Sequence, residues 1–243
     1  MGAGKIKWDQ IGERLYETGV DHGVLYLYDK ESKTFTNGVG WNGLTAVNEN
    51  PEGAEATPLY ADNIKYLNLM SAEDYKYTIE AYTYPDEFMA CDGSAELAPG
   101  VNVGQQPREM FGFCYRTLIG NDTEGTNLGY KLHLVYNSLA APASRDHATV
   151  NDSPEAANPS WEVSTTPIEV PGMKPTACIT IDSTKVSAEA LKSLENLLYG
   201  VDAASGVEAT VPTLPTPQQL IEIFGGDSEQ GGGDDSDDQN VNP

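Results

Sequence analysis

Apolar and polar side chains alternate along much of the chain between residues 14 and 182. A period of two is typical of half-buried strands. Tyr75–Ala81, Phe111–Ile119 and Tyr130–Tyr136 follow it, and the turn-forming residues of Gly120–Gly129 predict a hairpin between the last two. Further strands are predicted around Gly23–Tyr28, Leu59–Leu69, Trp161–Val170 and Thr176–Asp182. The pattern predicts an antiparallel, mainly β core.

Two segments have helical spacing instead. Leu191, Leu194 and Leu198 recur on one face behind a predicted N-cap at Ser187, and Gly200 stands where the helix would end. A shorter helix is indicated by Thr216, Pro217 and Gln219, which form a capping box with proline at the first helical position and precede Leu220–Gly225. We expect both helices to flank the sheet.

The predicted fold is therefore an antiparallel β-sandwich or barrel with one flanking α-helix and a short C-terminal helix. Residues 1–224 form one β domain in this interpretation. Residues 225–243 are rich in Gly and Asp with almost nothing apolar, so a flexible acidic tail is predicted there.

The net charge of the chain argues against functions that require binding to nucleic acids or anionic membranes. The chain of 243 residues has 14 Lys+Arg and 37 Asp+Glu, a formal net charge of -23. A protein that binds DNA, RNA or an anionic membrane through counterion release needs a basic surface, and this composition does not provide one. No apolar run approaches the roughly 18 residues of a membrane span, and the charged start of the sequence does not read as a secretory signal, so synthesis in the cytoplasm is expected.

The sequence contains no convincing catalytic, cofactor-binding or metal-binding motif. Gly38, Gly40 and Gly43 match a dinucleotide fingerprint, but no helical pattern follows, so a Gly-rich β-turn is the better interpretation. Three distant cysteines and three scattered histidines suggest neither a zinc site nor a Ser-His-Asp site. Among 37 acidic residues, a catalytic carboxylate pair remains open. We expect no cofactor, no metal site and no enzyme activity.

A β-rich chain with 13 tyrosines, 3 tryptophans, long polar loops and no catalytic signature suits a self-assembling structural subunit. Several long stretches resemble the major tail protein, or tail tube subunit, of long-tailed non-contractile bacteriophages that infect Gram-positive hosts. These stretches are Lys5–Tyr26, Gly40–Asn48, Tyr60–Tyr66, Thr78–Phe88 and Tyr115–Gly125. Both ends of the chain depart from the resemblance.

The resemblance implies six copies in a ring, rings stacked into a tube, and double-stranded DNA that passes through the lumen at ejection without specific binding. It implies contacts with tape-measure, initiator and terminator proteins, a place in the virion tail and assembly in the host cytoplasm. An acidic lumen would repel phosphates and let DNA slide; the alternative is that the acidity only maintains solubility before assembly.

By the same resemblance, loops and terminal segments join the rings, and residues 29–58 are the predicted stacking loop. The interface candidates are Trp8, Trp41, Tyr60, Asn37, Gly38 and Gly43. For the three aromatic rings, burial in the core is the alternative to an interface role. A glycan-binding or host-attachment β-sandwich is the second hypothesis for the whole chain, and a carboxylate-dependent hydrolase is the third.

Overall fold

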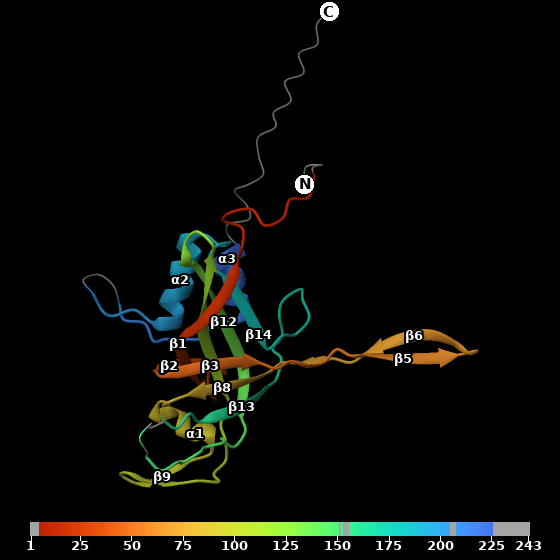
Figure 1. Ribbon diagram of the computed structural model, residues 1–243. Helices are drawn as coiled ribbons and strands as arrows, with labels where there is room; N and C mark the ends of the chain where they lie inside the picture. The colour runs from red at the N-terminus through yellow and green to blue at the C-terminus, as the bar shows by residue number, and fades with distance from the viewer. Residues whose placement is uncertain (1–4, 151, 153–155, 205–207, 226–243) are drawn as a thin grey trace, which may run out of the picture.

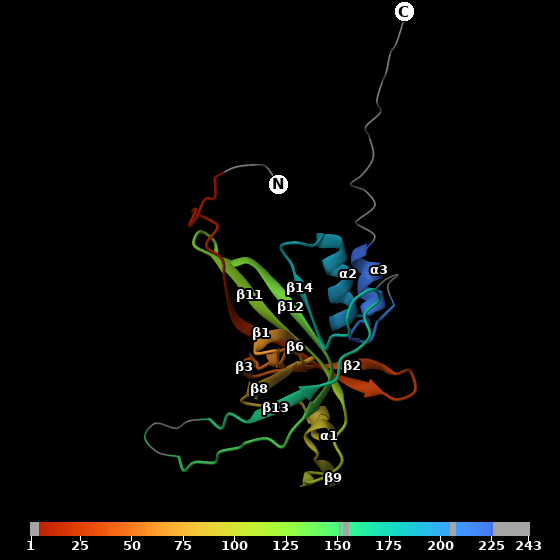
Figure 2. The same cartoon turned by 90° about the vertical axis from the view of Figure 1, so that its right-hand side faces the viewer.

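The computed structural model describes residues 5–150, 152, 156–204 and 208–225 (Figures 1 and 2). Its main sheet is antiparallel and follows the order β2-β1-β11-β12-β13-β8-β3, with β14 paired to β12 off this path. The strands of this sheet are β1 (Tyr16–Asp29), β2 (Thr34–Trp41), β3 (Leu44–Glu49), β8 (Lys76–Ala81), β11 (Phe111–Asn121), β12 (Gly125–Ala140), β13 (Ser160–Thr165) and β14 (Cys178–Asp182).

Strand β12 divides the sheet. Its residues 131–135 pair with β14, whereas residues 138–140 pair with β13. The two branches leave the same side of one strand and so cannot lie flat, and the branch through β13, β8 and β3 turns away from β14 (Figure 2). The division gives the molecule two separate apolar cores.

The first core lies on the face of the sheet that is enclosed by the branch through β13, β8 and β3. Alternate residues of β11, Phe111, Phe113 and Tyr115, point into it and meet Trp41 and Trp161. The 3-10 helix η1 (Asp86–Phe88) and the short helix α1 (Met89–Asp92) close this core with two buried side chains, Phe88 and Cys91. Large rings in edge-to-face contact fill the space.

The second core lies between the other face of the sheet and two helices, α2 (Ala188–Tyr199) and α3 (Pro217–Gly225), as Figure 2 shows. Cys114 of β11 and the β12 residues Leu132 and Leu134 face it, opposite Leu194 and Leu198 of α2. Strands β1, β11 and β12 are therefore buried on both faces, which explains why they carry the longest apolar runs.

Three two-stranded sheets lie outside the main sheet. They are β4 (Glu52–Gly53) with β7 (Glu73–Asp74), β5 (Ala56–Ala61) with β6 (Ile64–Met70), and β9 (Ala95–Ala98) with β10 (Val101–Val103). The β4–β7 pair forms the base of a long stalk, and β5–β6 stands at its end, far from both cores (Figure 1).

The predicted mainly β, antiparallel fold with flanking helices is confirmed. The β11–β12 hairpin and the strands at Gly23–Tyr28 and Tyr75–Ala81 are all present. Ser187 caps α2 by accepting a hydrogen bond from the Ala190 backbone nitrogen at 3.3 Å. In the capping box of α3, Gln219 Oε1 accepts from the Thr216 nitrogen at 2.9 Å.

Other predictions need correction. Leu59–Leu69 is two strands, because Asp62 and Asn63 both adopt positive φ and turn the chain between them. The strand predicted over Trp161–Val170 ends at Thr165. The Gly-rich segment after Gly38 belongs to β2, and only Asn42 and Gly43 form the turn to β3. The predicted tail begins at the last residue of α3, and residues 226–243 lie outside the described residues.

Candidate assembly surfaces

The β5–β6 hairpin, called the arm below, consists of residues 56–70. Asp62 and Asn63 have φ values of 49° and 63°, which fit the two-residue turn whose twist matches that of a β-ribbon. Every residue of both strands is exposed. A two-stranded ribbon has no core of its own and is marginal in water, so the arm lacks stabilising partners within the described chain.

Large apolar side chains cover the arm. Leu59 pairs across the strands with Leu67, and Leu69 follows two residues later on the same face, so three leucines form one apolar row. Tyr60, Tyr66 and Met70 are 70%, 69% and 71% exposed. Contiguous exposed apolar surface of this kind marks an interaction site.

Charge also distinguishes the arm. It carries one acidic residue, Asp62, and one basic residue, Lys65, within a chain of net charge -23. Two copies of an acidic protein repel each other over most of their surfaces, and a neutral apolar ribbon is where they can approach at the smallest electrostatic cost.

Residues 5–15, called the N-terminal segment below, form a second projecting surface. Ile6, Trp8, Ile11 and Leu15 are exposed, and Trp8 has 72% of its surface accessible. The segment is fixed to the body near its C-terminal end, where Gly12 bonds Asp122 Oδ1 through its nitrogen at 3.0 Å and accepts from Asn121 through its oxygen. It therefore leaves the body in a defined place, next to the β11–β12 turn (Figure 2).

The interface candidates separate into different environments. Trp8 and Tyr60 lie on the N-terminal segment and the arm, so core burial is excluded for both, and their interface role stays a prediction. Trp41 is only 3% exposed and donates from Nε1 to the Thr83 carbonyl at 2.9 Å. Trp41 therefore lies in the first core, which was the alternative to an interface role.

Asn37 and Gly38 belong to β2 of the main sheet, and Gly43 lies in the turn from β2 to β3, so none of the three lies on a projecting loop. A Cβ atom at Gly38 would come within 2.7 Å of Pro212 Cβ, and Gly43 has a φ of +79° beside Thr83. These two glycines therefore serve close packing and a turn. Asn37 has positive φ within β2 and is exposed.

The predicted stacking loop, residues 29–58, also needs correction. Residues 34–41 and 44–49 are β2 and β3 of the main sheet, and only the last part of the range belongs to the stalk and the arm. The projecting element instead covers the segment between β3 and β8. Sequence reasoning missed it because Asp62-Asn63, the one signal for a turn, lies inside an apolar run that was interpreted as a single strand.

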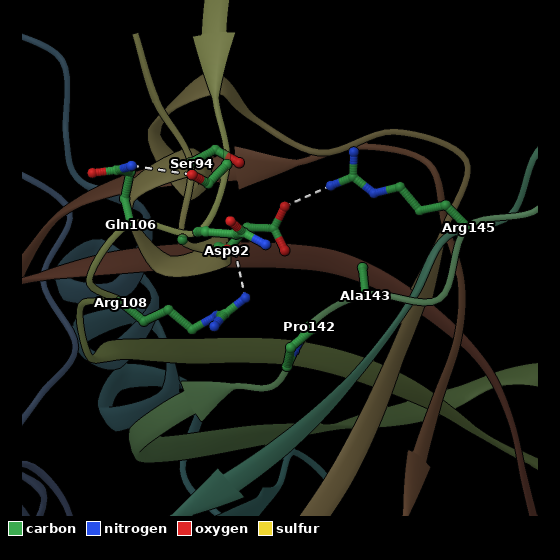
Figure 3. Close-up of a pocket in the computed structure, with 10 residues that line it drawn as sticks. Asp92, Ser94, Gln106, Arg108, Pro142, Ala143 and Arg145 are labelled. Carbon is green, nitrogen blue, oxygen red and sulfur yellow. Dashed lines mark hydrogen bonds and ion pairs between the residues drawn. The ribbon is translucent and has the colours of Figure 1, made fainter.

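A groove of about 550 Å³ beside α1 is a candidate for chemistry (Figure 3). Its centre is the buried Asp92, whose Oδ1 accepts from Trp161 Nε1 at 3.0 Å and whose Oδ2 accepts from Arg145 Nη2 at 2.5 Å. Arg108 donates to the Asp92 carbonyl. Both carboxylate oxygens are thus engaged, one by Trp161 of β13 and the other by Arg145, so Asp92 acts as a structural clamp that joins these two residues to α1.

A second polar cluster surrounds His133 on the inner face of β12. The ring stacks on Tyr115 with centroids 4.5 Å apart, its Nε2 lies 2.9 Å from Thr117 Oγ1, and its Nδ1 lies 3.6 Å from Glu49 Oε1. Burial lowers the pKa of His133, while Glu49 and Glu17 act in the opposite direction.

The order hydroxyl, imidazole, carboxylate is that of a nucleophilic triad, but the surroundings do not support catalysis. Thr117 lies in the paired part of β11, so its backbone neighbours are engaged in the strand ladder and supply no oxyanion donors. Its hydroxyl also donates to Glu17 Oε1 at 2.5 Å. Among the described residues, no group of three or more His, Cys, Asp or Glu side chains could hold a metal ion.

In the part of the chain that the structure describes, no helix is long and apolar enough to cross a membrane. No protein-family model matches the sequence, and no curated protein matches it either.

Solved structures give weak likenesses. One is a chain of the sheath-tube complex of an extracellular contractile injection system, with 10% identity over 73% of this chain and 94% of that chain and a TM-score of 0.32. Another belongs to the tube-terminating cap of the anti-feeding prophage, with 9% identity, 74% and 97% coverage and a TM-score of 0.37. A chain of the anti-feeding prophage baseplate gives 6% identity, 74% and 100% coverage and a TM-score of 0.36. Likenesses at TM-scores this low do not establish a common function.

Proposed function

We propose that this chain is a self-assembling structural subunit of a tail tube. Six copies form a ring, and rings stack into a hollow conduit through which double-stranded DNA leaves a phage of the long-tailed, non-contractile type. The observation that carries the proposal is the arm, an apolar and electrically neutral ribbon on a strongly acidic body. Contact with other copies would cover such a ribbon and stabilise it.

The remaining features support the same function. The two cores and the Asp92 clamp give a rigid body, while the N-terminal segment offers a second set of exposed apolar side chains. The acidic surface would let DNA slide through a lumen without being held. In this proposal the arm joins successive rings, and tape-measure, initiator and terminator proteins set where the tube begins and ends.

Negative-stain electron microscopy over a concentration series, with mass from light scattering on the same samples, tests the proposal. Rings or hollow tubes with sixfold units are expected for the wild-type chain. A protein that stays monomeric when an initiator complex is supplied, and that binds a sugar saturably on a glycan array, would overturn the proposal in favour of a glycan-binding module.

The arm itself is tested by replacing two leucines of its apolar row, Leu67→Ser with Leu69→Ser. If each leucine contributes about 1–2 kcal/mol to the contact, the concentration needed for assembly rises about 30-fold or more. A matched control replaces exposed apolar residues away from the arm, Met173→Ser with Val211→Ser. Both variants should melt like the wild type, because none of these side chains is buried, and only the arm variant should fail to assemble.

A further inference from the structure

The start of the N-terminal segment has the pattern of a strand but pairs with nothing in the described chain. Lys5, Ile6, Lys7 and Trp8 alternate polar and apolar, yet the first strand begins only at Tyr16. Both apolar side chains are exposed, and neither lysine is ion-paired among the described residues. An extended segment of this kind can add as a strand to an exposed sheet edge, whose backbone groups then form hydrogen bonds with its own.

Strand β14 offers such an edge. Its inner side bonds to β12: the Tyr136 nitrogen donates to the Ala177 oxygen at 2.9 Å, and the Ser183 nitrogen donates to the Tyr130 oxygen at 3.0 Å. Because hydrogen-bonded positions alternate along an antiparallel pair, residues 177, 179, 181 and 183 face β12, and the backbone groups of 178, 180 and 182 face outward. Both backbone groups of Cys178 already bond Thr176 Oγ1, and the Asp182 oxygen accepts from the Lys185 nitrogen. The backbone groups of Thr180 have no bonding partner among the described residues, so the free part of this edge is centred on Thr180.

The two faces of this edge match the two faces of the segment. On the helix side, Ile179 and Ile181 belong to the second core and leave an apolar row that Ile6 and Trp8 would extend. On the other side, Thr180 lines a hollow of about 330 Å³ together with Glu49 and Glu73. No Lys or Arg of the described chain pairs with either carboxylate, so the hollow can take the two lysines.

We propose that residues 5–8 of a second copy of this chain add as a strand to the outer edge of β14, with Lys5 and Lys7 facing Glu49 and Glu73. The occupant is a second copy because the segment continues from β1, which β11 and β12 separate from β14 in the main sheet, and leaves its own body beside the β11–β12 turn (Figure 2). The net charge of residues 5–15, three basic against two acidic, also complements the acidic body of a neighbour. The inference rests on the self-assembly proposed above.

A charge exchange tests the proposed pairing. Lys5→Glu with Lys7→Glu should raise the assembly concentration about tenfold or more, and adding Glu49→Lys with Glu73→Lys to that variant should restore most of the loss. The control, Lys33→Glu with Lys192→Glu, makes the same change in net charge at exposed lysines away from this hollow, and the Glu49 and Glu73 changes should not rescue it. Equal rescue of both variants, or no effect of the Lys5 and Lys7 changes, would overturn the inference.

Strand addition is tested separately at Thr180. Thr180→Pro removes an outward N–H without removing a bond to β12, so the subunit should fold and the added strand should be blocked. Thr180→Val, which keeps the N–H, is the control and should assemble. Tubes from the proline variant at wild-type concentration would contradict the proposed edge while leaving the tail tube function standing, whereas a wild-type chain that forms no assembly overturns both.

Discussion

His133 shows how one buried polar residue is accommodated between charged neighbours. Its ring is stacked on Tyr115, and its two nitrogens face Thr117 and Glu17 on one side and Glu49 and Thr180 on the other. Lys131 also lies close and pairs with Glu17. Burial outweighs the two carboxylates, and the pKa of His133 is lowered.

A pH dependence of stability follows from this lowered pKa. Below about pH 6.5 the unfolded chain binds a proton at residue 133 that the folded chain resists, so the free energy of unfolding falls as the pH drops from 7 to 5.5. We expect a smaller fall in a His133→Gln variant, measured by urea unfolding at both pH values. An identical fall in the two proteins would contradict this assignment.

The carboxylates act in a lower pH range. The pKa values of Glu17, Asp21 and Asp182 are all lowered, with hydrogen bonds from Lys131, Arg116 and Thr184 among the causes. Their contribution to stability is present above the pKa values of the unfolded chain, near 4, and is lost as the pH falls below them. The loss of unfolding free energy between pH 7 and 5.5 is therefore assigned to His133 and not to these carboxylates.

At the scale of elements, α2 is the helix on which the second core depends. Ala190, Leu194 and Leu198 are its buried residues, and Leu194 is fully enclosed. It is the longer of the two helices that cover this face of the sheet, so the helix and the sheet stabilise each other.

Replacing Leu194→Asp should prevent folding. The change leaves a cavity and places an unpaired carboxylate in an apolar core, which costs about 4 kcal/mol or more, a large part of the stability of a typical domain. Urea unfolding and solubility after expression provide the measurement. The control is Asn196→Asp on the exposed side of the same helix, and it should stay folded; soluble, cooperative unfolding of the Leu194 variant would refute the expectation.

The sequence indicated the elements whose local chemistry agrees with their final environment. The capping residues Ser187 and Thr216 and the alternation in β8 and β11 are signals of this kind, because a cap or a half-buried strand is defined by residues close in sequence. Strands β2 and β3 gave no clear signal in the sequence. Gly and Asn interrupt the alternation of β2, whose Gly38 packs against Tyr26 and Pro212, and the place of β3 depends on its pairing with β8.

The candidate surfaces were predictable only in part. Aromatic composition pointed to Trp8 and Tyr60, but the same reasoning selected Trp41, and nothing local distinguishes a tryptophan that fills a core from one that faces water. The arm was missed because an apolar run normally indicates burial. In this chain the run stands on a stalk, and only the long-range pairing of β4 with β7 reveals it.

At the scale of the whole molecule, an acidic body carries small apolar projections. The net charge of -23 opposes every approach of one copy to another, while the arm and the N-terminal segment favour it. The balance between the two therefore depends on how strongly the solution screens charge.

Assembly should accordingly become easier as salt is added. The Debye length falls from about 30 Å at 0.01 M to about 3 Å at 1 M, which removes most of the repulsion between bodies and leaves the apolar contacts intact. We expect the concentration at which light scattering detects assembly to fall about tenfold or more across this range. A rise with salt would mean that attractive ion pairs, and not apolar contacts, dominate the interface.

The separation of the three tryptophans gives the chain an optical property of its own. Trp41 and Trp161 are enclosed in the first core, whereas Trp8 stands in water on the N-terminal segment. Only Trp8 should be reached by a soluble quencher such as acrylamide, and only its emission should move to shorter wavelength when a neighbour covers it. The unlabelled protein can thus report, in real time, the moment at which its N-terminal segment becomes part of a larger particle.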